Sequence, residues 1–380
     1  MVSIIGAAMT PFGRHLDRTI VSLAIEATRL ALQDASLAKE RIGACYFANT
    51  LGPLIFGDTT LGQNLTAATG LHRIPVINVE NACASGSTAF YLARNAILAG
   101  DCEVALVVGA EKMCVPDFGL INSGATELDT QLGMVVPAGF ALKAQRHMYE
   151  YGTTTQQLAQ VTVKSRRHAA LNPLAQFRQP ESLEQVLASP LIADPLTRSQ
   201  CCPIADGAAA LILASDDFAA RMERVVKIKA SVLASGIYDG RCDLTHWETD
   251  YETVRLAYER AGIGPQDLDL VECHDAFTIS EILHYEALGL CDRGEGGQLA
   301  ESGATELGGR IPVNVSGGLL SRGHPIAATG LAQIVELVTQ LRHEAQDRQV
   351  EGCRIALAHC MGGDKAGDTK ACTVSVLEKN

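Results

Sequence analysis

The chain has 380 residues and a formal net charge of −12 at pH 7, and this length predicts two similar units or one duplicated fold rather than a single core. Because no basic run or basic amphipathic helix offsets the negative charge, neither nucleic acid nor a membrane is an expected partner. The 35 glycines, 47% hydrophobic residues and 5% aromatic residues suit tightly packed layers of helix on sheet.

The twelve cysteines indicate a reducing compartment and no metal site. Apart from Cys201-Cys202 they are scattered singly, without the paired spacing of a zinc site or the density of a secreted disulfide scaffold. The first residues lack the charged start of a signal peptide, and no apolar run reaches the ~18 residues that cross a bilayer. We therefore expect a soluble, cytoplasmic protein.

An internal repeat relates the two ends of the chain. Residues 29–45 align without a gap on residues 255–271, and both segments read as helix, turn and strand. A short strand, a turn and a helix follow at 77–98 and again at 314–341, each helix being followed by an apolar strand. Any two βα units share some of these features, but the shared order favours duplication, with mostly parallel sheets covered on both faces.

Cys83 lies in residues 81–87 (NACASGS), between a predicted strand at 77–79 and a predicted helix at 89–98. At a helix N-terminus, unpaired backbone N–H groups and the helix dipole favour the thiolate. Small neighbours let a thioester approach and leave backbone donors free for an oxyanion. The pattern predicts a nucleophile, and a buried structural cysteine is an equally good interpretation of this local sequence alone.

Residues 115–200 interrupt the alternation of strands and helices with six prolines and many polar residues. This region is predicted to be an inserted loop domain that projects from the first half, which comprises residues 1–114 and 201–222. Residues 223–380 then form the second half. The insertion lies beside the predicted nucleophile, so we expect it to act as a lid.

A predicted helix at 153–170 within the insertion carries Lys164, Arg166, Arg167 and His168. Basic side chains in an otherwise acidic protein are suited to a phosphorylated ligand. For any one of these residues, a solvated helix face is at least as good an interpretation.

Three further reactive side chains follow in the second half. His274 opens the stretch His-Asp-Ala-Phe after a predicted strand, His324 lies in a glycine-rich turn ahead of a helix, and Cys360 follows another strand. Taken alone, His324 would more simply be a satisfied core histidine. Each of the three, like Cys83, stands at the carboxyl end of a predicted strand, the edge where doubly wound sheets bind ligands. The four side chains are therefore predicted to form one site.

Together these segments resemble the thiolase superfamily. The resemblance rests on residues 6–14, the Cys83 turn, residues 109–113 and 206–209, the Gly-His-Pro turn at 323–325, and Cys360-Met361-Gly362, which look like the family's successive signatures. The motif His-Asp-Ala-Phe at 274–277 replaces the Asn-Glu-Ala-Phe of classical thiolases and resembles the sterol carrier protein-type and archaeal branch. The resemblance implies an α/β, five-layered αβαβα fold of two duplicated halves, normally a homodimer or tetramer.

The resemblance also implies a role for each reactive residue. Cys83 would accept the acyl group of an acyl-CoA thioester, with help from His324. Cys360 would act as acid and base at the α-carbon of a second acyl-CoA. His274 and His324 would hold the enolate oxygen, and the backbone N–H groups of Cys83 and Gly362 would form the other oxyanion hole.

Coenzyme A is the carrier that the resemblance implies, held by the loop domain and by the turn at Ser316 and Gly317. No metal and no permanently bound cofactor is expected. The chain departs from the family at Ala327, where glycine is usual, and residues 362–370 are more charged than the family's short glycine-rich turn.

The favoured prediction is an acetyl-CoA C-acyltransferase or acetyltransferase of the thiolase type, making or cleaving a 3-ketoacyl-CoA through an acyl-Cys83 intermediate. A ketoacyl synthase is an alternative, but it does not need a thiol at Cys360. A retro-aldolase acting on acyl-CoA is another, and it would make Cys83 dispensable. A non-catalytic subunit would instead bind acyl-CoA and scaffold a small partner of the OB-fold and zinc-ribbon type, but the presence of all four reactive residues argues against it.

Overall fold

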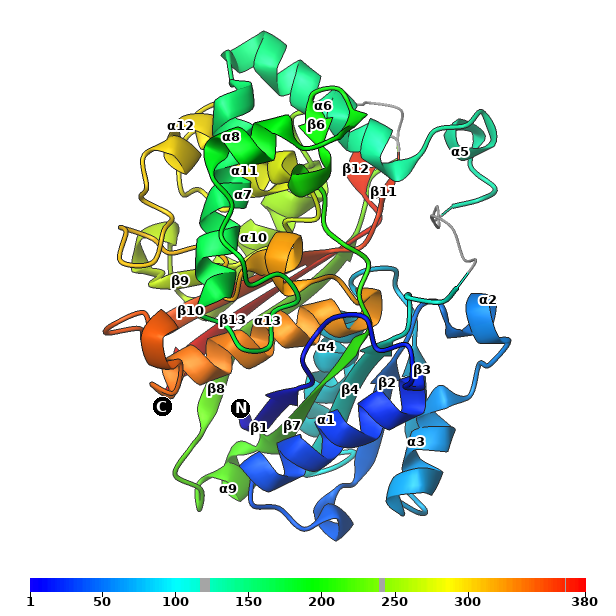
Figure 1. The fold of residues 1–380 in the computed structure, drawn as a ribbon. Coiled ribbons are helices and arrows are strands. Elements are labelled where there is room, and N and C mark those ends of the chain that lie inside the picture. The colour runs from blue at the N-terminus through cyan, green and yellow to red at the C-terminus, as the bar shows by residue number, and fades with distance from the viewer. Residues whose placement is uncertain (117–123, 239–242, 366) are drawn as a thin grey trace.

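The computed structural model describes residues 1–116, 124–238, 243–365 and 367–380 (Figure 1). The first half contains β1 (Val2–Met9), α1 (Ile20–Asp34), β2 (Ala44–Ala48), α2 (Gly52–Phe56), α3 (Leu61–Thr69), β3 (Val76–Val79), α4 (Ser85–Ala99), β4 (Val104–Glu111), β7 (Gly207–Ser215) and α9 (Asp216–Ala219). The second half contains β8 (Val226–Ser235), α10 (Glu248–Ala261), β9 (Leu270–Glu272), α11 (Thr278–Ala287), α12 (Gly296–Glu301), α13 (Ile326–Leu341), β10 (Ile355–Met361), β11 (Asp364–Lys365), β12 (Asp368–Thr369) and β13 (Ala371–Lys379).

Nine strands form one mixed sheet in the order β3-β2-β4-β7-β1-β8-β13-β10-β9. The prediction of mostly parallel sheets is wrong, because β1, β7, β8 and β13 run antiparallel to their neighbours, whereas β2 is parallel to β3 and β4, and β9 to β10. For β13, the physical reason for the antiparallel direction is its short connection to β10. Strand β13 returns from β10 through the short β11–β12 hairpin, which a parallel pair could not use.

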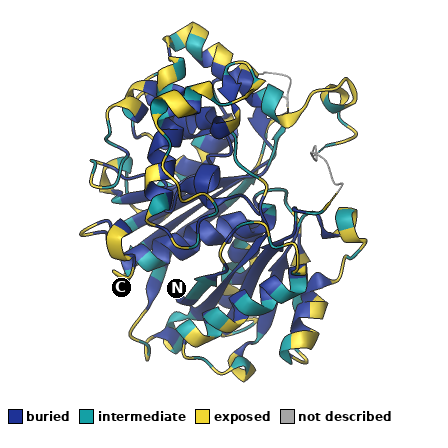
Figure 2. Ribbon diagram, in the orientation of Figure 1, coloured by how far each residue is buried: buried dark blue, intermediate teal, exposed yellow. Residues whose placement is uncertain are grey.

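The elements stack in the five layers that the family resemblance implied (Figure 1). Helices α1 and α3 cover the outer face of the first half-sheet, and α10 covers that of the second, with α11 packed beside it. Between the two half-sheets lie α4 and α13, whose packed faces are buried with the strands (Figure 2). A short antiparallel pairing of β1 with β8 joins the halves edge to edge.

The central layer is packed without room for a further methyl group. A Cβ atom at Gly86 would lie 2.4 Å from the carbonyl oxygen of Ala327, and one at Gly109 would lie 2.3 Å from the same oxygen. Glycine at these two positions therefore lets α4 and β4 reach the first turn of α13. That turn follows directly on His324.

The internal repeat is visible in the element order. Helix α1, a short 3₁₀ turn at Lys39–Arg41 and β2 correspond to α10, a 3₁₀ turn at Pro265–Asp267 and β9. The two 3₁₀ turns begin 226 positions apart, the offset of the sequence repeat.

The inserted residues were predicted to project from the first half. In the structure they also pack on the second half. Their helices are α5 (Leu128–Gln131), α6 (Val136–Tyr151), α7 (Thr155–Ala170) and α8 (Leu183–Ala188), followed by the short strands β5 (Leu191–Ala193) and β6 (Leu196–Thr197). Helix α7 packs on α11 and α12 of the second half, and apolar residues of all three helices are buried together. Among the described residues, no helix has both the length and the apolar character needed to cross a membrane.

Candidate active site

The four predicted reactive side chains meet between the halves. Cys83 precedes α4, Cys360 is in β10, His274 follows β9 and His324 precedes α13. The Cys360 Sγ atom lies 3.3 Å from the carbonyl oxygen of Cys83 and 3.5 Å from Nδ1 of His274. The Cys83 sulfur and a ring nitrogen of each histidine lie within 4.8 Å of one another. The four residues thus form one constellation of two thiols and two imidazoles.

A strained turn presents Cys83. Ala82 has φ +48°, and its N–H donates to Glu80 Oε1 at 2.8 Å, while its carbonyl oxygen accepts from the Ser85 hydroxyl at 2.6 Å. These bonds hold a backbone conformation that alanine rarely adopts. The turn places the thiol just before the first helical residue, Ser85.

The resting form of Cys83 differs from the predicted thiolate. Burial raises the pKa of the Cys83 thiol to about 12, because the charged form loses solvation. The N–H group of Gly363 and that of Cys83 itself lower this pKa, whereas the negative charges of Glu111 and Glu80 raise it. Burial therefore outweighs the helix terminus, and the free enzyme holds a neutral thiol that needs a base.

His324 has the tautomer that such a base requires. Its Nδ1 atom lies 2.7 Å from the Thr329 hydroxyl, and this hydroxyl donates to the Pro325 carbonyl oxygen at 2.9 Å. The hydroxyl proton is thus committed, so the hydrogen-bond pattern assigns the ring proton to Nδ1 and leaves the Nε2 lone pair free. Burial, together with the positive charge of Arg322, lowers the pKa of His324 to about 3, which keeps the ring neutral.

Cys360 and His274 are also neutral. Burial raises the pKa of the Cys360 thiol, and burial and His324 lower the pKa of His274. The Cys360 S–H donates to the carbonyl oxygen of Cys83. The backbone carbonyl of His274 lies 3.1 Å from Nε2 of His284, which fixes the strand end that carries the imidazole.

The amides near Cys83 differ from the prediction by one residue. The Gly362 N–H donates to the Ala371 carbonyl oxygen at 2.7 Å, so it is engaged in the β10–β13 connection. The neighbouring Gly363 N–H faces the Cys83 sulfur. Gly363, with the amide of Cys83, is therefore the pair available to an oxyanion in this structure.

Ser316 and Gly317 lie in the core, away from the predicted CoA contact. The Ser316 hydroxyl donates to Glu272 Oε2 at 2.6 Å, and a Cβ atom at Gly317 would lie 2.6 Å from the side chain of Ala169. Neither residue lines the cavity above Cys83. Their turn supports the His324 loop through the buried pair of Arg322 and Glu272.

Glu111 holds the backbone around the site, and its place in the sequence did not predict this role. Its buried carboxylate accepts from the backbone N–H groups of Thr50, Leu51 and Ala327 at 3.1–3.2 Å. Burial raises its pKa to about 7, and these donors oppose the shift. The carboxylate therefore ties β4 to the first turn of α13. The only signal in the sequence is its place in the stretch 109–113.

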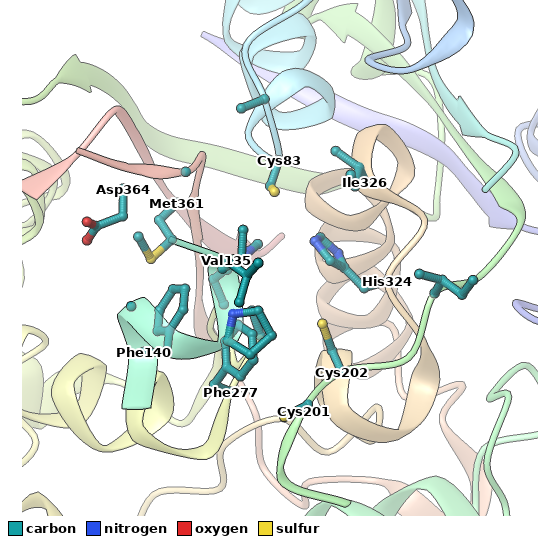
Figure 3. Close-up of a pocket in the computed structure, with 18 of the residues that line it drawn as sticks. Cys83, Val135, Phe140, Cys201, Cys202, Phe277, His324, Ile326, Met361 and Asp364 are labelled. Atoms are coloured by element: carbon teal, nitrogen blue, oxygen red, sulfur yellow. The ribbon is translucent and has the colours of Figure 1, made fainter. Parts of the chain in front are cut away.

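A cavity of about 1700 Å³ lies over the constellation (Figure 3). Cys83 and His324 point into it from the two halves, and Phe140 enters from α6 of the insertion. Much of its wall is apolar, and it is formed in part by Val135, Phe140, Cys202, Phe277, Ile326 and Met361. These residues were not predicted, because apolar residues that line a cavity look like core residues in the sequence.

Of the four basic residues predicted to meet a ligand, only Arg166 lines the cavity. Lys164 is buried and bonded to Glu281, and His168 bonds the backbone of Asn314 and Leu307. Arg167 is exposed and pairs with Glu306 at 3.1 Å, outside the cavity lining. The face of α7 that carries Lys164 and His168 is thus a packing surface on the second half.

The fold and this site define a member of the thiolase family, and sequence comparison shows it directly: the thiolase N-terminal domain matches residues 2–217, and the thiolase C-terminal domain-like family matches residues 236–377. The chain belongs to this family and is a CoA-dependent acyltransferase of the thiolase type.

Individual relatives match the sterol carrier protein-type and archaeal branch that the motif at 274–277 indicated. Acetyl-CoA acetyltransferase of Methanothermobacter thermautotrophicus is 41% identical over 369 residues, covering 95% of this chain and 96% of the relative. Human sterol carrier protein 2 is 38% identical over 386 residues, covering 95% of this chain and 70% of the relative. Among solved structures, the Ltp2-ChsH2(DUF35) aldolase superposes with a TM-score of 0.86 at 25% identity, covering 100% of this chain and 97% of that chain.

Thr329→Val should lower kcat by on the order of 10²-fold with little change in KM, because it removes the hydroxyl that fixes the His324 tautomer. Steady-state kinetics would measure kcat and KM, and thermal unfolding would show whether the variant is as stable as the native protein. Thr339→Val is the matched control, since its hydroxyl makes the same bond to the preceding turn of α13, toward Val335, far from the site. Equal kcat values for the two variants would contradict the assigned tautomer.

Alkylation of Cys83 in the free enzyme should accelerate about tenfold per pH unit throughout the neutral and mildly alkaline range, because the reactive thiolate stays a minor species below its raised pKa. The measurement is the rate of Cys83 carbamidomethylation by peptide mapping, made in Cys360→Ala to remove the second thiol. A rate that levels off near pH 7 would show a preformed thiolate and refute the neutral resting state.

Proposed function

We propose that Cys83 is the nucleophile of this thiolase and that the chain makes or cleaves a 3-ketoacyl-CoA through an acyl-Cys83 thioester. The observation that carries the proposal is the meeting of two thiols and two neutral imidazoles, of which Cys83, His274 and His324 line one cavity and Cys360 lies buried directly behind them. His324 Nε2 takes the thiol proton as the sulfur attacks the acyl-CoA carbonyl, and the Cys83 and Gly363 amides stabilise the oxyanion.

Cys360 would then carry out two further proton transfers, one to the CoA thiolate and one from the α-carbon of the second acyl-CoA. As a thiol it gives its proton to the departing CoA thiolate, and as the resulting thiolate it removes the α-proton of the second acyl-CoA. The carbanion attacks the acyl-Cys83 carbonyl, the carbon–sulfur bond to Cys83 breaks, and the departing Cys83 thiolate recovers its proton from His324 Nε2. His274, 3.5 Å from Cys360, and His324 would stabilise the enolate oxygen. A ketoacyl synthase would not require a thiol at this place.

Intact mass measurement after brief incubation with acetyl-CoA or acetoacetyl-CoA tests the first step. We expect one acetyl group, mapped to Cys83, in the native protein and in Cys360→Ala, and none in Cys83→Ala. Cys360→Ala should lose exchange of the acetyl-CoA α-protons with deuterium. An adduct on another residue, or normal exchange in Cys360→Ala, would overturn the corresponding role. The absence of any adduct would favour a retro-aldolase or a scaffold subunit.

We infer that the insertion holds the phosphates of CoA at the cavity mouth. Arg178 and Arg198 are exposed in the cavity lining, and their guanidinium groups make no ion pair or hydrogen bond with any residue that the structure describes. Arg166 also lines the cavity; its Nη2 atom pairs with Glu181 at 3.6 Å, whereas its Nε and Nη1 atoms are buried without a hydrogen-bond partner among the described residues. Unpaired guanidinium groups suit phosphate oxygens, which they bind in a bidentate manner.

The double variant Arg178→Ala/Arg198→Ala should raise KM for acetyl-CoA roughly tenfold, because charge-assisted bonds to phosphate are lost. KM for S-acetylpantetheine, which has no nucleotide phosphates, should stay unchanged, as should kcat. Arg167→Ala is the control, because that arginine is on the same insertion but pairs with Glu306. An equal rise in KM for both substrates would refute the phosphate contact.

We further propose that the chain assembles as a homodimer or tetramer and accepts a small OB-fold and zinc-ribbon subunit. The aldolase of similar fold, Ltp2-ChsH2(DUF35), is named with a DUF35 component. Exposed apolar side chains in the cavity lining, among them Leu54, Leu128 and Leu142, offer a surface for such a contact.

A further inference from the structure

A second cluster of reactive side chains lies behind the active site and has no part in the proposed chemistry. Asp250 is on α10, His359 on β10 and Cys372 on β13, and each of the three is 0% exposed. One oxygen of Asp250, one ring nitrogen of His359 and the sulfur of Cys372 lie within 4.8 Å of one another. His284, on α11, adds its Nδ1 atom 3.2 Å from Asp250 Oδ2.

The contacts that Asp250 makes in this cluster are close without being well-formed hydrogen bonds, whereas Cys372 Sγ and His359 Nε2 lie at hydrogen-bond distance from each other, 3.5 Å. Nε2 of His359 also lies 3.2 Å from Asp250 Oδ2, yet neither carboxylate oxygen of Asp250 accepts a well-formed hydrogen bond from any described residue. The Nδ1 atom of His284 is likewise without one. A fully buried carboxylate in this state is costly, because two imidazole contacts of poor hydrogen-bond geometry replace only part of the water it has lost. Its lone pairs need a partner.

The spacing fits a metal ion. Zn²⁺ binds imidazole nitrogen, carboxylate oxygen and thiolate sulfur at distances that make the edges of its tetrahedron about 3.3 Å between nitrogen and oxygen and about 3.5 Å between nitrogen and sulfur. The observed separations are 3.2 Å between His359 Nε2 and Asp250 Oδ2 and 3.5 Å between His359 Nε2 and Cys372 Sγ.

We propose that Asp250, His359 and Cys372, with His284 as the fourth ligand, form a structural site for a divalent transition metal, Zn²⁺ in particular. This inference goes beyond the proposed function, which needs no metal, and it departs from the expectation of no metal site. The donor set of one thiolate, two imidazoles and one carboxylate is that of zinc rather than of calcium or magnesium. Complete burial makes the site a closed one, filled as the chain folds.

The metal would connect the outer helices to the catalytic edge of the sheet. It would bind α10 and α11 to β10 and β13, and Cys360 is the residue after the His359 ligand. Through its other nitrogen, His284 donates to the carbonyl oxygen of His274 at 3.1 Å. A metal-bound imidazole commonly donates its second N–H in this way, which orients the ligand. The metal-free alternative is a buried ion pair between Asp250 and a protonated histidine.

Metal analysis of the untagged protein, purified from zinc-containing medium and dialysed against a chelator, tests the proposal. We expect one zinc per chain in the native protein and a loss of zinc in Cys372→Ser and in Asp250→Asn. Cys83→Ala must keep its zinc, because Cys83, His274 and His324 also lie within 4.8 Å of one another and are a competing site. Cys353→Ser, a buried cysteine outside the cluster, is the control for thiol loss.

A second measurement keeps the proposal testable if the ligand variants fail to fold. The native protein, refolded with Co²⁺ in place of zinc, should show the absorption bands of a tetrahedral cobalt–thiolate centre, both in the unmodified chain and in Cys83→Ala. A native protein that folds with no more metal than its Cys372→Ser variant, and without a cobalt–thiolate band, would refute the site and leave the ion pair. Acylation of Cys83 tests the proposed function independently of this result.

Discussion

The packing of the first turn of α13 between the two half-sheets is the constraint on which the site depends. The carbonyl oxygen of Ala327 lies so close to Gly86 and Gly109 that neither position has room for a Cβ atom. Glu111 accepts from the amide of the same residue. The turn after His324 is therefore held next to the Cys83 loop by the close packing of the two glycines and by the hydrogen bond to Glu111. A site shared by two halves needs this rigidity, because catalysis tolerates little misplacement of the reacting groups.

The second consequence of this packing is desolvation. Burial keeps both thiols and both imidazoles neutral, so the site stores no thiolate–imidazolium pair at rest. Negative charge would develop on the thioester carbonyl oxygen only as it is attacked. The N–H groups of Cys83 and Gly363 are positioned to donate hydrogen bonds to that oxygen. Donors that are already oriented need no reorganisation when the charge appears, and they act more strongly in a site that excludes water. A neutral resting thiol also protects the nucleophile from oxidation between turnovers.

The duplication and the meeting of the four reactive residues could be predicted from the sequence because each leaves a local pattern, whereas the five layers were implied by the family resemblance. The offset of 226 residues, the turn around Cys83 and the Gly-His-Pro turn are such patterns. The antiparallel strands could not be predicted, since strand direction depends on how distant elements connect. Ser316 and Gly317 failed as CoA contacts for a similar reason. A glycine-rich turn can serve either a ligand or the close approach of a helix, and here Gly317 meets Ala169 of α7.

The Asp250 cluster shows the limit of spacing rules most clearly. Its four residues come from two helices and two strands, separated by 34, 75 and 13 positions, so no short motif records them. What reveals them is an energetic inconsistency: a buried carboxylate that lies 3.2 Å from two imidazole nitrogens and close to a sulfur atom, yet accepts no well-formed hydrogen bond from the described residues. Native proteins rarely leave such a group unpaired. The same outer helices carry His284, which holds the backbone of His274, so whatever neutralises Asp250 also fixes one wall of the catalytic site.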